Sequence, residues 1–149
     1  MRATVQRVQS AKVVVDMATV GRIDLGLLVY AAAAPDDGAE DVAYIADKVA
    51  HLRIFNDQAH KMNLDVGRAG GAVLLISAFA LYADARRGRR PSFESAARGD
   101  VAEPLIDQLA DAIRRHGLTV ATGRFAATMQ VESVNDGPIC ILLDSRRGF

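Results

Sequence analysis

The sequence predicts a single α+β domain over residues 1–149, in which two helices pack on a mixed or largely antiparallel sheet. Three observations support this class. Near the N-terminus, apolar and polar residues alternate as they do in half-buried strands. Two short apolar runs, 27–34 and 72–81, are typical of strands buried on both faces. Segments 39–52 and 101–116 carry apolar residues at three- and four-residue spacings, which indicates amphipathic helices.

The first third of the chain is expected to form strands. Residues 2–8 and 11–15 are predicted to be two strands, and a turn at 16–19 leads into a third strand at 20–23. The run 27–34 is predicted to be a central strand, although its four alanines also suit a helix.

The rest of the chain is expected to combine helices, strands and one long loop. Asp36 to Gly38 offers capping residues for the first helix, and Pro104 suits the first turn of the second. Residues 84–100 are predicted to be a polar loop. The other expected strands lie at 53–55, 72–81, 118–122, 129–134 and 139–143.

Length and composition limit the class of protein. A chain of 149 residues can bury one core without a metal or a disulfide. The 18 Lys and Arg residues balance 18 Asp and Glu residues, so only a local cluster would attract phosphate. The single cysteine fits a reducing compartment. We find neither a signal peptide nor an apolar run that spans a bilayer, and we expect a soluble cytoplasmic protein without membrane contact.

The usual patterns of catalytic side chains are absent. His51, His60 and His116 lack metal-ligand spacing, both among themselves and with Cys140. A nucleophilic Cys140 would need a histidine base, and we expect instead a buried structural cysteine. Ser77 lacks the flanking glycines of a serine-hydrolase elbow. The sequence therefore predicts neither a metal site nor a cofactor.

One stretch with a possible function is rich in arginine. Arg86, Arg87, Arg89 and Arg90 fall within five residues, and Phe93 follows them. This composition suits phosphate contact and base stacking, so we expect a nucleic-acid contact here. A merely solvated loop is the alternative.

A second such stretch is Asn135-Asp136-Gly137-Pro138, which precedes an apolar strand. Glycine lets another molecule approach the main chain closely, and proline fixes φ and lacks an N–H. Such a turn can present carbonyl oxygens to a ligand. An ordinary turn that starts a strand is the alternative.

Read together, several segments resemble the D-aminoacyl-tRNA deacylase family over almost the whole chain. They are MRATVQRVQSAKVVVD, VGRIDLGLLV, KVAHLRIFND, KMNL, LLISAFALYAD, GRRPSF, TGRFAATMQVESVNDGP and the final LLDS. The resemblance implies that family's compact fold, a homodimer, and metal-independent hydrolysis of the ester bond of D-aminoacyl-tRNA or glycyl-tRNA. Such a reaction is a chirality-based proofreading step in translation.

The resemblance also implies roles for individual residues. Gly137 and Pro138 match a motif, normally cis, that projects from one subunit into the partner's site, where main-chain carbonyls hold the substrate's amino group and exclude an L side chain. Arg7 matches an arginine that braces this motif across the dimer, and Met129 matches a residue that lines the pocket. Cys140 stands where the family usually has threonine.

The family's second motif is altered in this chain. The usual Ser-Gln-x-Thr-Leu is here Ser77-Ala78-Phe79-Ala80-Leu81. In the mechanism inferred for the family, backbone N–H groups of Ser77 to Ala80 stabilise the developing oxyanion, and the 2′-hydroxyl of the tRNA assists water. Because backbone donors survive side-chain replacement, we expect weakened binding or shifted specificity before inactivity. The alternative is an inactive homologue that keeps the dimer and binds RNA or a small metabolite.

Overall fold

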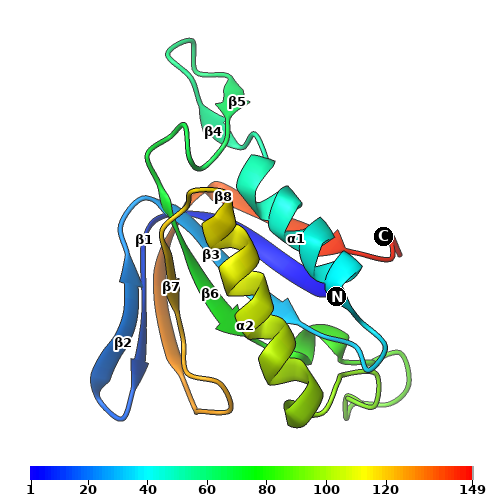
Figure 1. Cartoon of the computed structure of the whole chain (residues 1–149). Coiled ribbons are helices and arrows are strands. Elements are labelled where there is room, and N and C mark those ends of the chain that lie inside the picture. Colours follow the sequence, from blue (N-terminus) through cyan, green and yellow to red (C-terminus); the bar gives the residue numbers. More distant parts are fainter. Residues whose placement is uncertain (149) are drawn as a thin grey trace.

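The long N-terminal strand β1 (Arg2–Val15) is the centre of the fold because it pairs with three other strands. Its first half pairs antiparallel with β3 (Gly26–Ala32), and its second half with β2 (Ala18–Ile23). On its other edge it pairs antiparallel with β8 (Gln130–Asp144). The computed structural model, which describes residues 1–148, shows β1 and β8 as long strands and the shorter β2 at one side of the molecule (Figure 1).

Two parallel strands extend the sheet beyond β3. β6 (Ala72–Ser77) pairs with β3, and β7 (Val120–Thr122) pairs with β6, which gives the order β2-β1-β3-β6-β7. The sheet curls until β2 approaches β7, since a Cβ on Gly21 would lie 2.4 Å from the carbonyl oxygen of Thr122. The predicted class, a mixed sheet in a single α+β domain, is confirmed.

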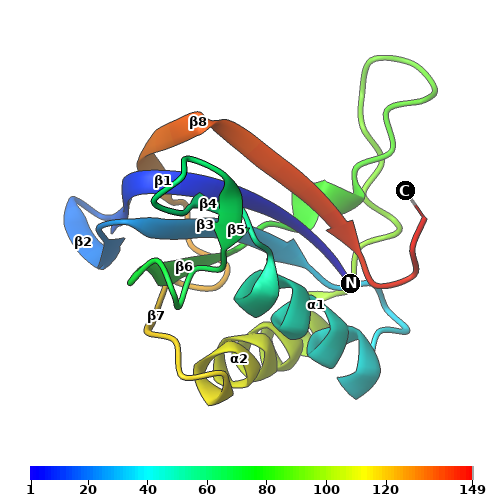
Figure 2. The ribbon, with the colours of Figure 1, turned by 90° about the horizontal axis from the view of Figure 1, so that it is seen from above.

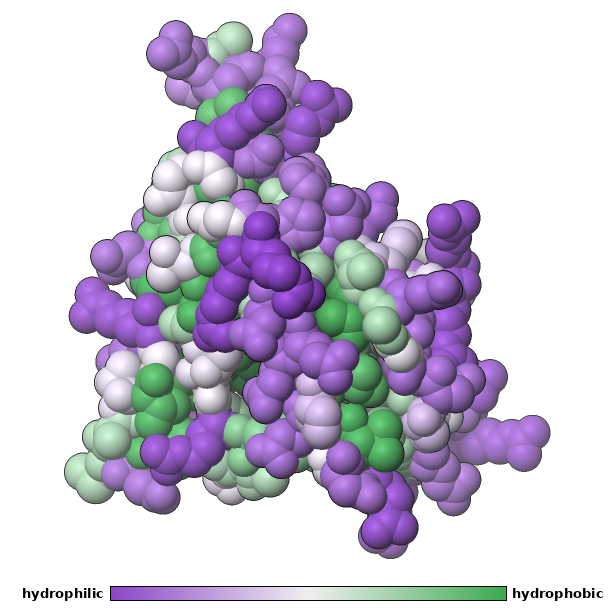
Figure 3. Space-filling model, in the orientation of Figure 1, coloured by the Kyte–Doolittle hydropathy of each residue, from purple (hydrophilic) through white to green (hydrophobic). Residues whose placement is uncertain are grey.

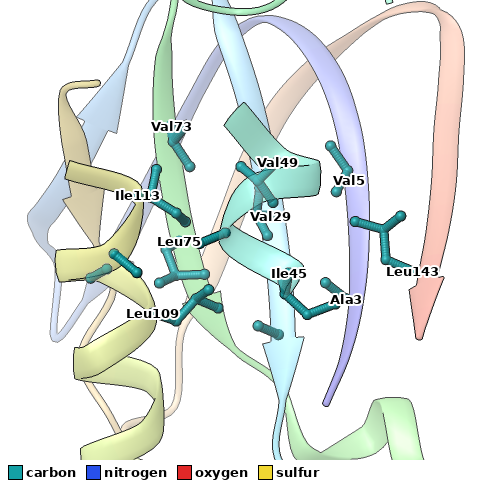
Figure 4. Close-up of a cluster of buried hydrophobic side chains, with 14 of the residues drawn as sticks. Ala3, Val5, Val29, Ile45, Val49, Val73, Leu75, Leu109, Ile113 and Leu143 are labelled. Carbon is teal, nitrogen blue, oxygen red and sulfur yellow. The ribbon is translucent and has the colours of Figure 1, made fainter. Parts of the chain in front are cut away.

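Helices α1 (Ala39–His51) and α2 (Gly99–Arg115) cover one face of the sheet (Figure 2). Both agree with the predicted helices. Their apolar stripes pack against inward-pointing side chains of β1, β3, β6 and β8 to form the main core (Figure 4). A second core fills the inside of the curled sheet. Its fully buried members are Val8, Val13, Leu28, Leu74 and Ile76.

Two pairs of predicted strands are in fact single strands. Residues 2–8 and 11–15 are joined within β1, and residues 129–134 and 139–143 are joined within β8. The pairing of β1 with β8 shifts register between Gln6 and Ser10. Bulges of this kind absorb unpaired residues without ending a strand, which explains why the polar interruptions in the sequence indicated strand ends.

The second apolar strand ends earlier than predicted. β6 stops at Ser77 instead of residue 81, and the chain continues as the short 3₁₀ helix η1 (Phe79–Tyr82). β3, which is the neighbour of β6, ends at Ala32, so a longer β6 would have no partner on that side. For the run 27–34, the structure shows strand β3 and not the alternative helix.

A small hairpin was only partly predicted. β4 (Phe55–Asn56) and β5 (Met62–Leu64) pair antiparallel and project from the C-terminal end of α1 (Figure 1). The Asp57 carboxylate organises the connecting turn by accepting hydrogen bonds from the N–H groups of Ala59 and Lys61.

Polar side chains cover most of the helical face, with apolar side chains visible in smaller patches (Figure 3). Across residues 1–148, no helix has the length and apolar character needed to cross a membrane.

Close packing between β3 and β6 depends on a glycine. A Cβ on Gly26 would lie 1.9 Å from the carbonyl oxygen of Ala72, in the adjoining strand β6. We predict that Gly26→Ala lowers the free energy of unfolding by about 2 kcal/mol, because the backbones must separate. Gly67→Ala is the matched control, since its nearest neighbour would lie at an ordinary 3.4 Å. Urea unfolding of both variants measures the effect, and equal stability would contradict it.

Candidate active site

A cavity of about 580 Å³ opens where β3 and β6 end. Four segments line it: the end of β3, the link from β6 into η1, the N-terminal part of α2, and the stretch between β7 and β8. Within residues 1–148, Ser77 and Thr128 contribute the only polar side chains of its lining. The cavity is therefore mainly apolar, with its polar groups supplied largely by the main chain.

The predicted catalytic segment, Ser77 to Ala80, forms one wall of this cavity. The N–H of Ala78 donates to the carbonyl of Ala31 at 2.9 Å, so this donor is already used. The N–H groups of Phe79 and Ala80 stand at the start of η1, where a helix has no internal acceptors. The hydrogen bonds within residues 1–148 give these two groups no acceptor elsewhere. Two main-chain donors are thus left at the cavity wall.

Met129 also lies in the cavity wall, opposite a glycine that makes room for it. A Cβ on Gly123 would lie 2.7 Å from the Met129 sulfur and 3.1 Å from Cδ1 of Ile76. The N–H of Gly123 donates to the carbonyl of Leu75, which fixes this segment beside β6. Phe125 and Thr128, which the sequence did not single out, line the same wall within the TGRFAATM stretch.

Gly137 and Pro138 lie elsewhere, in an irregular part of β8 opposite Arg7. Their peptide bond is cis, and both residues are exposed. The stretch is not the strand-starting turn that the sequence offered as an alternative, because β8 continues on both sides of it. Gly137 has φ +144, and a Cβ there would lie 2.8 Å from the nitrogen of Ile139, so the position favours glycine.

The side chain of Asn135 spans the Gly-Pro pair. Its Oδ1 accepts from the N–H of Ile139 at 2.9 Å, and its Nδ2 donates to the carbonyl of Ile139 at 3.2 Å. From the sequence, Asn135 was expected only to be a turn residue. Its amide replaces a missing backbone partner and holds the two ends of the bulge together.

Arg7 holds the same bulge from the neighbouring strand. Its side chain is almost completely buried, with Nε donating to the carbonyl of Asp136 at 3.0 Å and Nη1 donating to the carbonyl of Ile54 at 2.7 Å. Nε also lies 3.3 Å from Oδ2 of Asp136. These contacts fall within one chain. A brace across a dimer, as the resemblance implied, stays a prediction.

The Gly-Pro pair is far from the cavity of its own chain. Across the sheet, β1 and β3 separate β8 from β6. Along the strands, Asn135 is level with Val8, Gly26 and Ala72, whereas Ser77 is level with Ala31. Strand spacing and rise then place Gly137-Pro138 roughly 15–20 Å from Ser77. The pair therefore cannot contact a ligand in its own chain's cavity unless the ligand is large.

Cys140 is exposed, which corrects the expectation of a buried cysteine. It lies on an outer strand whose flanking residues Ile139 and Ile141 turn toward the main core, so Cys140 points to the opposite face. Leu142 on the same face is 60 % exposed. This face of β8 is thus apolar and uncovered within one chain.

The arginine-rich segment forms a loop with a closed neck. Asp84 and Ser92 exchange backbone hydrogen bonds of 2.8 and 2.9 Å. Arg86 folds back onto the neck, where Nε and Nη2 donate to the two carboxylate oxygens of Asp84 at 2.9 and 2.7 Å. These hydrogen bonds hold the pKa of Asp84 well below its usual range, so the pair stays ionised at neutral pH.

The histidines do not form a metal centre. His51 contacts Asp47 through Nδ1 and packs edge-on against His116, with ring centroids 5.0 Å apart. Within the described part of the chain, no group of three or more His, Cys, Asp or Glu residues is placed to hold a metal ion.

The Arg7 contacts yield a stability prediction. Replacing Arg7 with methionine leaves the carbonyls of Ile54 and Asp136 without their donor, so we expect the free energy of unfolding to fall by about 1–3 kcal/mol. Arg22→Met is the matched control, because the Arg22 side chain is 69 % exposed and its ion pair within residues 1–148 is a long one, 3.5 Å to Asp24. Chemical denaturation decides the point, and a loss no greater than that of Arg22→Met would show that these contacts contribute little.

Comparison with known proteins identifies close relatives. The family model for D-Tyr-tRNA(Tyr) deacylase matches residues 4–144. D-aminoacyl-tRNA deacylases of Anaeromyxobacter dehalogenans and Thermotoga petrophila are 55% and 52% identical to this chain, with full coverage of both chains. That of Clostridioides difficile is 50% identical, also over the full length of both.

Two solved structures share the fold. A c-Myc DNA unwinding element binding protein superimposes with a TM-score of 0.90 at 30% identity, covering 97% of this chain and 98% of its own. A probable eukaryotic D-amino acid tRNA deacylase superimposes with a TM-score of 0.82 at 17% identity, covering 95% and 97%. At that identity the second likeness supports the fold alone.

Proposed function

We infer the activity from a premise that the comparisons establish: the chain belongs to the D-Tyr-tRNA(Tyr) deacylase family. It is a hydrolase that cleaves the ester bond of D-aminoacyl-tRNA, and tRNA is therefore its substrate partner. The observation that carries this assignment is the full-length identity of about half of all residues with D-aminoacyl-tRNA deacylases. We propose that it acts in the cytoplasm, where its substrate is made and used.

We propose that the chemistry takes place at the cavity beside η1. The ester carbonyl would lie against the N–H groups of Phe79 and Ala80, which have no acceptor within residues 1–148. Donors placed at the developing oxyanion stabilise the transition state without supplying a proton. The sequence led us to expect backbone donors from Ser77 to Ala80. The N–H of Ala78 already donates to the carbonyl of Ala31, so we do not include it among the oxyanion donors. In this scheme the 2′-hydroxyl of the terminal ribose assists the attacking water.

The altered motif is compatible with this scheme. Replacing side chains at 78 and 80 by methyl groups removes polar contacts to the 3′ end of the tRNA but leaves the main-chain donors in place. A lost positioning hydrogen bond costs about 0.5–1.5 kcal/mol, whereas a lost oxyanion donor costs about 2.7–4 kcal/mol. We therefore favour a working enzyme over an inactive homologue that only binds RNA or a metabolite.

We propose that selectivity for the D configuration comes from a second copy of the chain. Gly137 and Pro138 are exposed, are held by Arg7 and Asn135, and lie too far from their own cavity to serve it. The uncovered apolar face of β8, with Leu142 and Cys140, offers a surface for dimerisation. The partner's Gly-Pro carbonyls would then bind the substrate's amino group at each cavity.

A rigid main-chain wall rejects substrates by handedness instead of by side-chain identity. An L side chain would collide with this wall, whereas a D side chain would point away from it, and negative selection of this kind needs no contact with the side chain. Glycine has no side chain to reject. We therefore propose that glycyl-tRNA is also cleaved.

The activity is tested directly with matched substrates. We expect rapid release of the amino acid from D-tyrosyl-tRNA, slower release from glycyl-tRNA, and no release above background from L-tyrosyl-tRNA. Radiolabelled amino acid remaining on the tRNA is the readout. Cleavage of D and L forms at one rate would refute the chiral filter, and intact D-tyrosyl-tRNA at high enzyme concentration would refute the assignment of activity.

Restoring the usual side chains tests the role of the main chain. We expect the double variant Ala78→Gln/Ala80→Thr to lower KM for D-aminoacyl-tRNA by about tenfold, the effect of one regained hydrogen bond. Its kcat should stay within about threefold of the wild-type value. Steady-state kinetics on both proteins give the two constants. A large gain in kcat from a nearly inactive starting protein would instead show that the natural pocket has lost its catalytic groups.

A further inference from the structure

An aromatic pair joins the arginine loop to the rim of the cavity. The Asp84–Ser92 neck places Phe93 immediately outside the loop, where its ring packs edge-on against Phe79 with centroids 5.0 Å apart. Phe79 lines the cavity, yet 59 % of it is exposed, and Phe93 is 41 % exposed. Two aromatic rings thus present an open surface directly beside the site of the terminal nucleotide.

The arginines of the loop are not equivalent. Arg86 is neutralised by its bidentate contact with Asp84. Arg87, Arg89 and Arg90 are exposed, and no ion pair or hydrogen bond to any residue of 1–148 engages them. The loop projects from the body of the molecule (Figure 2). Its three exposed guanidinium groups are therefore available to a negatively charged partner.

We propose that Phe93 and the three free arginines bind the nucleotides that precede the terminal adenosine of the tRNA. The ring of Phe93 stacks on a base, and Arg87, Arg89 and Arg90 contact successive phosphates. Arg86 is not included, because its guanidinium group is already paired with the Asp84 carboxylate at the neck of the loop. The proposal rests on the proposed function, since it takes the position of the 3′ end from the cavity.

The dimensions and chemistry of the surface fit this occupant. Phe93 follows Arg89 by four positions in the chain, so the two lie at most about 14 Å apart, which is about four times the 3.4 Å rise per nucleotide of a stacked strand. Aromatic rings stack on any base, and arginines neutralise any phosphate, so such a surface binds without reading sequence. The enzyme would in this way hold tRNAs of different sequence equally well.

The test compares two substrates that differ only in the RNA beyond the terminal nucleoside. One is D-tyrosyl-tRNA, and the other is 3′-O-(D-tyrosyl)adenosine. We expect the triple variant Arg87→Ala/Arg89→Ala/Arg90→Ala to raise KM for the tRNA substrate about tenfold at low salt, and to reduce the slope of log KM against log salt by about 2 to 3. Its kcat/KM for the adenosine ester should equal that of the wild type.

Phe93→Ala tests the stacking contact, with Phe93→Tyr as the variant that keeps a ring. We expect the alanine variant to raise KM for the tRNA substrate at least fivefold without changing the salt slope, and the tyrosine variant to resemble the wild type. The charge control is Arg53→Ala/Lys61→Ala/Arg115→Ala. These three exposed cations lie just beyond α1, in the β4–β5 hairpin and at the end of α2, away from the arginine loop.

Three results would overturn the proposal. The arginine variant could show the same salt slope as the wild type, or it could lose equal activity on the tRNA substrate and on the adenosine ester. The charge control could also change the salt slope as much as the arginine variant does. Binding of uncharged tRNA, measured for the same variants, separates the proposal from the assigned activity. If the wild type left D-tyrosyl-tRNA intact, the assigned activity would be refuted. The salt dependence of tRNA binding, compared between the wild type and the arginine variant, would still decide whether the arginine loop contacts RNA.

Discussion

The antiparallel pairing of β1 with β8 is the constraint on which the rest of the structure depends. This pairing runs along the whole of β1, and its register shifts on both sides of Val8, where β8 carries an irregular stretch opposite Arg7. A buried guanidinium group and the side chain of Asn135 supply the hydrogen bonds that the interrupted ladder lacks. The Gly-Pro pair is thus presented on a rigid strand and not on a mobile loop.

The cavity lies in another part of the same sheet, at the ends of the interior strands β3 and β6. β3 and β6 run parallel, so their C-terminal ends meet, and the chain turns there into η1 with two main-chain N–H groups unused. A site built from backbone donors tolerates change in its side chains. Under the proposed mechanism, that property would account for alanine at positions 78 and 80 in a chain that is 55% identical to the D-aminoacyl-tRNA deacylase of Anaeromyxobacter dehalogenans.

The periodic parts of the fold were predictable from the sequence. Both helices and the central strand β3 follow from patterns of apolar residues that are satisfied locally. The continuity of β1 and β8 was not predictable, because a bulge depends on the partner strand. The exposure of Cys140 was not predictable either, because the sequence does not show that its strand lies at the edge of the sheet and buries one face only.

The candidate site was likewise predictable only in part. Ser77 to Ala80 and Met129 were named through a family resemblance, and the structure places them around one cavity. Composition alone grouped Arg86 with the neighbouring arginines, because the sequence does not show which arginine an aspartate will neutralise. The role of Asn135 was not predictable from the sequence either. Its side-chain amide forms hydrogen bonds with the backbone of Ile139, four residues later, and these depend on the irregular path of β8.

The central claim is that the Gly-Pro pair of one subunit completes the cavity of another. It is tested most directly by mixing two inactive proteins, Gly137→Val, which spoils the pair, and Ala80→Trp, which fills the cavity. Each heterodimer contains one intact site, so refolding the two chains together should restore about a quarter of wild-type deacylation of D-tyrosyl-tRNA. A mixture no more active than its separate components would contradict the claim.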